Sequence, residues 1–161
     1  MREIPYDRAA ALAYARRWAR ARNPAYYNFD GLGGDCTNFA SQCLYAGCGV
    51  MNYTPDYGWY YISLDNRSPA WTGVTFLYDF LINNRSVGPY ARRVPIGELM
   101  AGDLIQLGRA NGEFYHTLVV LATRPHILVA AHTDDSLNRP LSSYRYDTAR
   151  YLHIEGARTW Q

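Results

Sequence analysis

One cysteine and two histidines are the residues of this chain whose types and order could do covalent chemistry. Cys36 follows the glycine-rich stretch Gly33-Gly34-Asp35, whereas His116 and His132 come far downstream. A cysteine thiolate is a nucleophile, and a histidine can act as the base that removes the thiol proton. The set predicts attack on an amide carbonyl, with Cys36 as nucleophile, His116 as base and His132 as the residue that orients the His116 ring.

The nucleophile needs a helix that presents it. The pattern predicts a helix from about Cys36 to Ala46, capped by Asp35 and ended by Gly47 in a left-handed turn. Unpaired N–H groups and the helix dipole at such an N-terminus lower a thiol pKa. The backbone N–H of Cys36 would also be a donor for the oxyanion.

The histidines need a sheet that brings them together. Two apolar runs, residues 115–122 and 127–132, predict buried strands, and as antiparallel neighbours they would place His116 and His132 at the same end of the sheet. Each residue alone has a plainer explanation, because a cysteine at a helix start is often just a small buried side chain. The conjunction of all three, in this order, favours catalysis.

The remaining pattern predicts an α+β fold. Helical spacing covers residues 6–22 and 71–83, a long polar surface segment covers residues 48–70, and strands follow at about 103–107 and 145–155. Asn111-Gly112 predicts a hairpin turn. Helices first and strands afterwards indicate helices packed on a C-terminal antiparallel sheet. A chain of 161 residues has the length of one domain, which we expect to span residues 1–161.

Composition excludes some classes of function. A net charge of +2 is too small to suggest a nucleic-acid partner, and no apolar run approaches the ~20 residues that span a membrane. The first residues lack the apolar segment of a signal peptide. Two locations stay open: the cytoplasm, or the cell envelope if a leader or carrier domain lies outside this sequence. The three cysteines form no metal-ligand pattern, and a Cys43–Cys48 disulfide and the oligomeric state are left open.

The segment from Gly33 to Gly47 resembles the signature of the "putative amidase domain" family, which we relate to the NlpC/P60- and CHAP-like branch of papain-fold cysteine hydrolases. Further agreement lies at Tyr6-Asp7-Arg8, at Gly102-Asp103-Leu104-Ile105 and at Ala131-His132-Thr133. The resemblance implies a papain-like fold with the nucleophile helix packed on an antiparallel sheet.

The same resemblance implies roles for the site residues. Cys36 would be the nucleophile, His116 the base and His132 the third polar residue, with Asp134 in reserve. Tyr27 is a weaker candidate for the oxyanion site, and Asp35 for contact with a substrate amine, although helix capping is an equal explanation for Asp35. The chemistry requires no metal and no organic cofactor.

The leading hypothesis is therefore a cysteine amidohydrolase or peptidase that cleaves peptide-like amides through a thioester, with bacterial cell-wall peptides as the implied substrates. An acyltransferase or deamidase would use the same cysteine and histidine. A catalytically inert module that binds glycan or peptide in a tyrosine-rich cleft around Trp59 and Trp71 is the alternative from another class, and a structural partner domain is a further one.

Overall fold

The structure is a computed structural model that describes residues 1–161. It combines a few helices with a seven-stranded antiparallel sheet whose order is β1-β9-β5-β6-β7-β8, with β4 also paired to β9. A separate two-stranded ribbon is formed by β2 and β3. The strands are β1 (Arg2–Ile4), β2 (Tyr61–Ser63), β3 (Asn66–Arg67), β4 (Gly88–Val94), β5 (Leu104–Gly108), β6 (Phe114–Ala122), β7 (Leu128–Ala131), β8 (Ser136–Pro140) and β9 (Thr148–Thr159).

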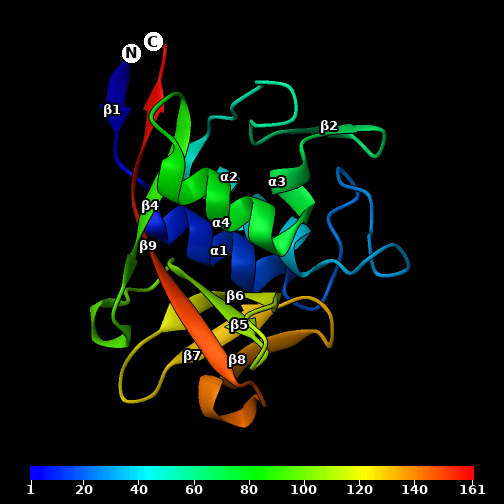
Figure 1. Cartoon of the computed structure of the whole chain (residues 1–161), viewed down its shortest axis with the longest axis vertical. Helices are drawn as coiled ribbons and strands as arrows, with labels where there is room; N and C mark the ends of the chain where they lie inside the picture. The colour runs from blue at the N-terminus through cyan, green and yellow to red at the C-terminus, as the bar shows by residue number, and fades with distance from the viewer.

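The helices lie together on one side of the sheet, and the N- and C-termini lie side by side where β1 pairs with β9 (Figure 1). They are α1 (Arg8–Trp18), α2 (Cys36–Cys48), α3 (Pro69–Thr72) and α4 (Val74–Asn83), with short 3-10 turns η1 (Ile96–Glu98) and η2 (Leu141–Ser143). None of these helices has the length and hydrophobicity that a membrane crossing requires.

The sheet separates two hydrophobic cores because successive strand residues point to opposite faces. Along β6, Val119 and Leu121 belong to the larger core under the helices, whereas Leu118 and Val120 belong to a smaller core on the other face. This alternation decides which functional side chains meet the helices. The predicted mixture of helices and antiparallel sheet is confirmed at this level.

Helix α2 is longer than the sequence predicts. It continues through Gly47 to Cys48 and ends at Gly49, which has φ +69°. Gly47 is needed for close packing instead: its carbonyl accepts from the Asp7 N–H at 2.8 Å, and a Cβ there would clash with the Tyr6 ring. The start of α1 therefore crosses α2 at this point.

Other differences arise where a predicted helix is interrupted and where short strands pair with their neighbours. The helical pattern at residues 71–83 is split into α3 and α4 at Gly73, whose backbone is extended. β1, β4 and β8 were not predicted, since they are short or carry polar and proline residues and are held by pairing with neighbouring strands. The hairpin turn is confirmed, with Gly112 at φ +90°.

Candidate active site

Cys36 is the first residue of α2 and is 7% exposed. Asp35 occupies the N-cap position, but its side chain makes no capping hydrogen bond, so the predicted cap is wrong. The first intrahelical bond runs from the Phe39 N–H to the Asp35 carbonyl, and no backbone acceptor pairs with the N–H of Cys36. The uncapped helix end leaves that donor free for an oxyanion.

Cys36 and His116 open onto one cavity of about 310 Å³. His116 lies near the start of β6 and is 8% exposed, so both reactive groups are largely buried yet reachable. No hydrogen bond joins the sulfur to the imidazole in this structure; the thiol contacts the Thr37 hydroxyl at 3.8 Å. The remaining lining residues are Gly33, Gly34, Leu107, Tyr115, Thr133, Asp134, Arg139, Tyr144 and Arg145.

The electrostatics of this pair differ from the prediction of a lowered thiol pKa. Burial raises the pKa of Cys36, and hydrogen bonds from the Thr117 backbone N–H and from Thr37 offset only part of that effect. Burial lowers the pKa of His116 to about 4, with the nearby Arg139 guanidinium lowering it further and Asp134 opposing. Near neutral pH the site therefore holds a neutral thiol and a neutral imidazole. A neutral imidazole is the form of His116 that can accept the thiol proton.

His132 does not orient His116, and this expectation is corrected. Its Nδ1 lies 2.5 Å from Asp35 Oδ2, and its Nε2 donates to the Trp18 carbonyl at 2.7 Å. The His132 ring stacks on the Phe39 ring with 4.1 Å between the ring centroids, on the side of the sheet that the helices cover. By the two-residue period His116 falls on the opposite face, with Leu118 and Val120. His132 instead ties the end of α1 to the start of α2.

Asp35 is fully buried, so it cannot meet a substrate amine, and that expectation is also corrected. Burial disfavours the carboxylate, but hydrogen bonds from His132, Asn38 and the Phe29 N–H outweigh burial and hold its pKa below the usual value. The arrangement makes Asp35 a buried anchor for the loop that precedes Cys36.

Of the two weaker candidates, Asp134 lines the cavity and Tyr27 does not. Asp134 lines the cavity, has φ +60° and pairs with Arg139 at 3.4 Å. Tyr27 is 43% exposed, its ring packs edge-on against Phe29, and it is not part of the cavity lining. The structure thus brings Asp134, but not Tyr27, to the wall shared by Cys36 and His116.

Tyr144 and Arg139 form a wall of the site that sequence reasoning missed. The Tyr144 ring lies 5.9 Å from the His116 ring between centroids, and the Arg139 guanidinium carbon lies 3.7 Å from the Tyr144 centroid. Arg139 lies on β8 and Tyr144 directly after η2, and Leu141 and Tyr144 pack on the face of the sheet away from the helices. No motif marks them, because the chain places them only through the pairing of β8 with β7.

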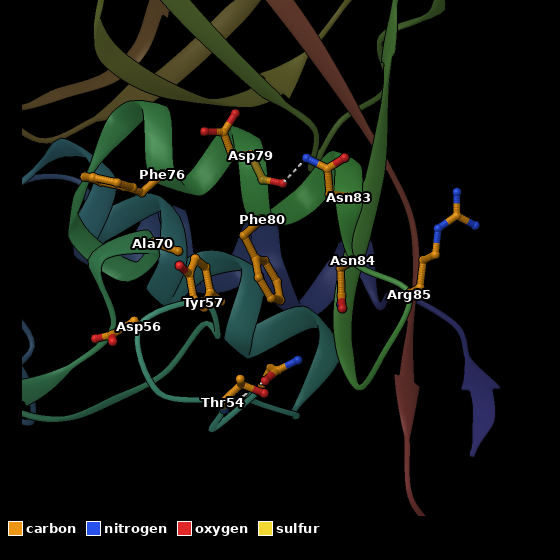
Figure 2. A pocket seen from close by; sticks show the side chains of 11 residues that line it. Thr54, Asp56, Tyr57, Ala70, Phe76, Asp79, Phe80, Asn83, Asn84 and Arg85 are labelled. Atoms are coloured by element: carbon orange, nitrogen blue, oxygen red, sulfur yellow. Dashed lines mark hydrogen bonds between the residues drawn. The ribbon is translucent and has the colours of Figure 1, made fainter.

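A larger cavity, with a volume of about 610 Å³, lies elsewhere in the molecule. Figure 2 shows the Phe80 ring directed into it, Asn83 bonded back to the Asp79 carbonyl, and the Asp56 and Asp79 carboxylates set apart on different segments. No cysteine or histidine lines it. It therefore offers no cysteine–histidine pair.

The geometry describes the cysteines and the possible metal ligands as follows. All three cysteines are free, so Cys43 and Cys48 form no disulfide. No group of three or more His, Cys, Asp or Glu side chains is arranged to hold a metal ion.

Comparison with known proteins places the chain in a family. The family model described as "Putative amidase domain" matches residues 5–154. A Bacillus subtilis (strain 168) protein described as "Uncharacterized protein YhbB" is 39% identical over 155 residues, which cover 92% of this chain and 48% of that protein. The chain thus spans about half the length of this relative. No solved structure matches significantly. Because this family model matches nearly the whole chain, the protein belongs to the putative amidase domain family.

Proposed function

We propose that this protein is a cysteine-dependent amidohydrolase with Cys36 as nucleophile and His116 as general base. The observation that carries the proposal is a shared cavity onto which a helix-terminal thiol and a neutral histidine both open. The family match supports amidase chemistry in general, and the relation to NlpC/P60- and CHAP-like papain-fold enzymes remains part of the proposal.

The reaction follows from the protonation states. As the Cys36 sulfur attacks the amide carbon, His116 takes the thiol proton, so no thiolate has to form beforehand. The carbonyl oxygen becomes an oxyanion, for which the unpaired N–H of Cys36 is the proposed donor. His116 then gives its proton to the leaving amine, and a thioester remains on Cys36. Water, deprotonated by His116, attacks the thioester and releases the carboxylic acid and the thiol.

The substrate we propose is a peptide-like amide, with bacterial cell-wall stem peptides as the class to test first. The alternative of an inert module would need exposed Trp59 and Trp71 side chains in its binding cleft. Both indoles are fully buried, so the structure does not favour this alternative. A deamidase or acyltransferase would differ in the acceptor of the acyl group, so it is distinguished by product.

The first test compares two cysteines of equal exposure. Cys36 and Cys48 are both 7% exposed, but burial raises the pKa of Cys48 to about 11, and only Cys36 has a hydroxyl donor and a histidine on the same cavity. Iodoacetamide labelling followed by peptide mass spectrometry should modify Cys36 faster than Cys48, because the hydroxyl and the histidine assist loss of the thiol proton. Equal rates at both cysteines would contradict an activated nucleophile.

The second test is turnover. Digested peptidoglycan incubated with the protein should yield product masses of a cleaved amide, and Cys36→Ala and His116→Gln should each lower the rate by at least about 10²-fold. Cys48→Ala is the matched control and should retain the rate. Cleavage that survives in Cys36→Ala would refute the mechanism, whereas products carrying an added amine would identify an acyltransferase.

A further inference from the structure

Arg150 on β9 is a buried arginine without an anionic partner. The residue is 7% exposed, and its guanidinium carbon lies 3.6 Å from the Tyr78 ring centroid and 3.8 Å from that of Phe114. One of its Nη atoms is buried with no hydrogen-bond partner, and no carboxylate forms an ion pair with it. Burying a charge without an opposite charge is costly, so some compensating role is expected.

A continuous chain of hydrogen bonds leads from this arginine to the cysteine. Arg150 Nε donates to Gln106 Oε1 at 2.8 Å, and Gln106 Nε2 lies 3.3 Å from the Thr117 hydroxyl. The Thr117 and Thr37 hydroxyls are 2.9 Å apart, and Thr37 Oγ1 lies 3.8 Å from Cys36 Sγ. Arg150, Gln106 and Thr117 are directly paired residues on the adjacent strands β9, β5 and β6, so the chain crosses the sheet in one line.

The chemistry of the side chains fixes the direction of the first two bonds. Arginine can only donate, so the Gln106 oxygen faces Arg150; the other end of the amide must then be the NH₂ group, which donates to the Thr117 hydroxyl and to the Val74 carbonyl at 2.9 Å. Either hydroxyl could donate in the Thr117–Thr37 bond, and we assign the Thr117 proton to Thr37 because Thr37 Oγ1 is the acceptor within reach of it. The Thr37 O–H is then available for the Cys36 sulfur. In this assignment every donor along the hydrogen-bond chain points toward Cys36.

We propose that Arg150 and Gln106 are positioning residues that direct the Thr37 hydroxyl at the Cys36 sulfur through this buried chain, and so stabilise the negative charge that develops on the sulfur. The inference rests on the proposed function, in which Cys36 is the nucleophile. It also accounts for the buried arginine, whose positive charge stands at the far end of the aligned donors and whose only polar contact is Gln106.

Other charged and titratable groups face the thiol, and their influence must be separated from that of the chain. Asp35, which precedes Cys36 on the same segment, raises the pKa of the thiol. From the elements around the cavity, the groups are Tyr115 and His116 on β6, Asp134 after β7, Arg139 on β8, and Tyr144 and Arg145 after η2. All of these stay unchanged in the variants below.

The experiment is the pH profile of Cys36 alkylation, read by mass spectrometry, in wild type and three variants. Thr37→Val removes the donor with almost no change of shape. Gln106→Glu keeps a partner for Arg150 but offers only acceptors, so Thr117 would donate to the carboxylate and the Thr37 O–H would be drawn toward the Thr117 oxygen instead of the sulfur. Both variants should move the profile to higher pH and slow labelling about threefold to tenfold at a fixed pH below the thiol pKa.

Thr37→Ser is the rescue variant and should restore the wild-type profile, since it keeps the hydroxyl. Thr75→Val, at an exposed position of α4, is the matched control and should change nothing. An unchanged pH profile in Thr37→Val would overturn the proposed hydrogen-bond chain, even if Cys36 remains more reactive than Cys48. If wild-type Cys36 reacts no faster than Cys48, the proposed function fails, while a shift in Thr37→Val and Gln106→Glu would still support the chain.

Discussion

The chemistry of Cys36 is set by a competition between burial and hydrogen bonding. A helix N-terminus favours the thiolate, but an almost fully buried sulfur loses its hydration, and burial raises the pKa of the thiol. His116 is shifted in the opposite sense for the same reason, because burial disfavours the imidazolium. The two shifts together favour a neutral pair and a base-assisted attack.

The titration of His116 tests this view. A pKa of about 4 means that the ring stays neutral down to that pH and becomes protonated only below it. An NMR titration, with the signal assigned by its loss in His116→Gln, should give a midpoint near 4. Arg139→Met should raise the midpoint, because the nearby positive charge is removed. A wild-type midpoint near the ordinary value of about 6.5 would contradict a neutral pair sustained by burial.

Three elements meet at the buried Asp35–His132 pair. The Trp18 carbonyl ends α1, Asp35 precedes α2, and His132 follows β7, so the two hydrogen bonds of the imidazole hold all three together. This contact fixes the position of the N-terminus of α2 and hence of the candidate nucleophile. A carboxylate that could have capped the helix is used for tertiary structure instead.

Removal of the charge of Asp35 should therefore destabilise the fold. Asp35→Asn keeps the shape but breaks a buried pair, for which about 3–5 kcal/mol is expected. Since the pKa of Asp35 is lowered in the folded protein, its contribution is present above the unfolded pKa of about 3.9 and is lost as the pH falls through the folded value. Urea unfolding at several pH values measures both effects. Asp134→Asn, an exposed carboxylate, is the control, and an equal loss in both variants would argue against the anchor.

Two segments that resemble the family are joined far from the cysteine. The Tyr6 hydroxyl donates to the Gly102 carbonyl at 2.8 Å, and Arg8 donates to Asp103 at 2.8 Å. Asp103 is fully buried and also bonds His153 and the Ile154 N–H. The start of α1, the turn before β5 and the middle of β9 are thus held together around one carboxylate. These motif residues serve the whole fold rather than the site.

Arg8→Met should lower the thermal midpoint of the entire protein. The substitution leaves a buried carboxylate with fewer partners, for which about 1–3 kcal/mol is expected. Arg16→Met, on the exposed part of the same helix, is the matched control and should cost less than about 0.5 kcal/mol. Calorimetry provides the comparison. Equal midpoints for the two variants would show that Asp103 does not need Arg8.

Much of this molecule could be predicted from its amino acids because the signals are local. Helix period, glycines at turns and apolar strand runs predict α1, α2, β5, β6 and β7 to within a few residues. The cysteine at the start of α2 and the histidine near the start of β6 follow from the same local patterns, and they do face one cavity. Gln106 and Thr117 are polar residues within apolar strands, but no local pattern indicates which side chains they contact.

The role of His132 could not be predicted, because it depends on strand register. β6 and β7 pair Val119 with Ala130, a register that continues to Thr117 opposite His132. A shift of one residue would have put both histidines on the same face, whereas the observed register puts them on opposite faces. Register, burial and the cross-sheet partners of Arg150 are long-range properties, set by packing between segments that local sequence patterns do not connect.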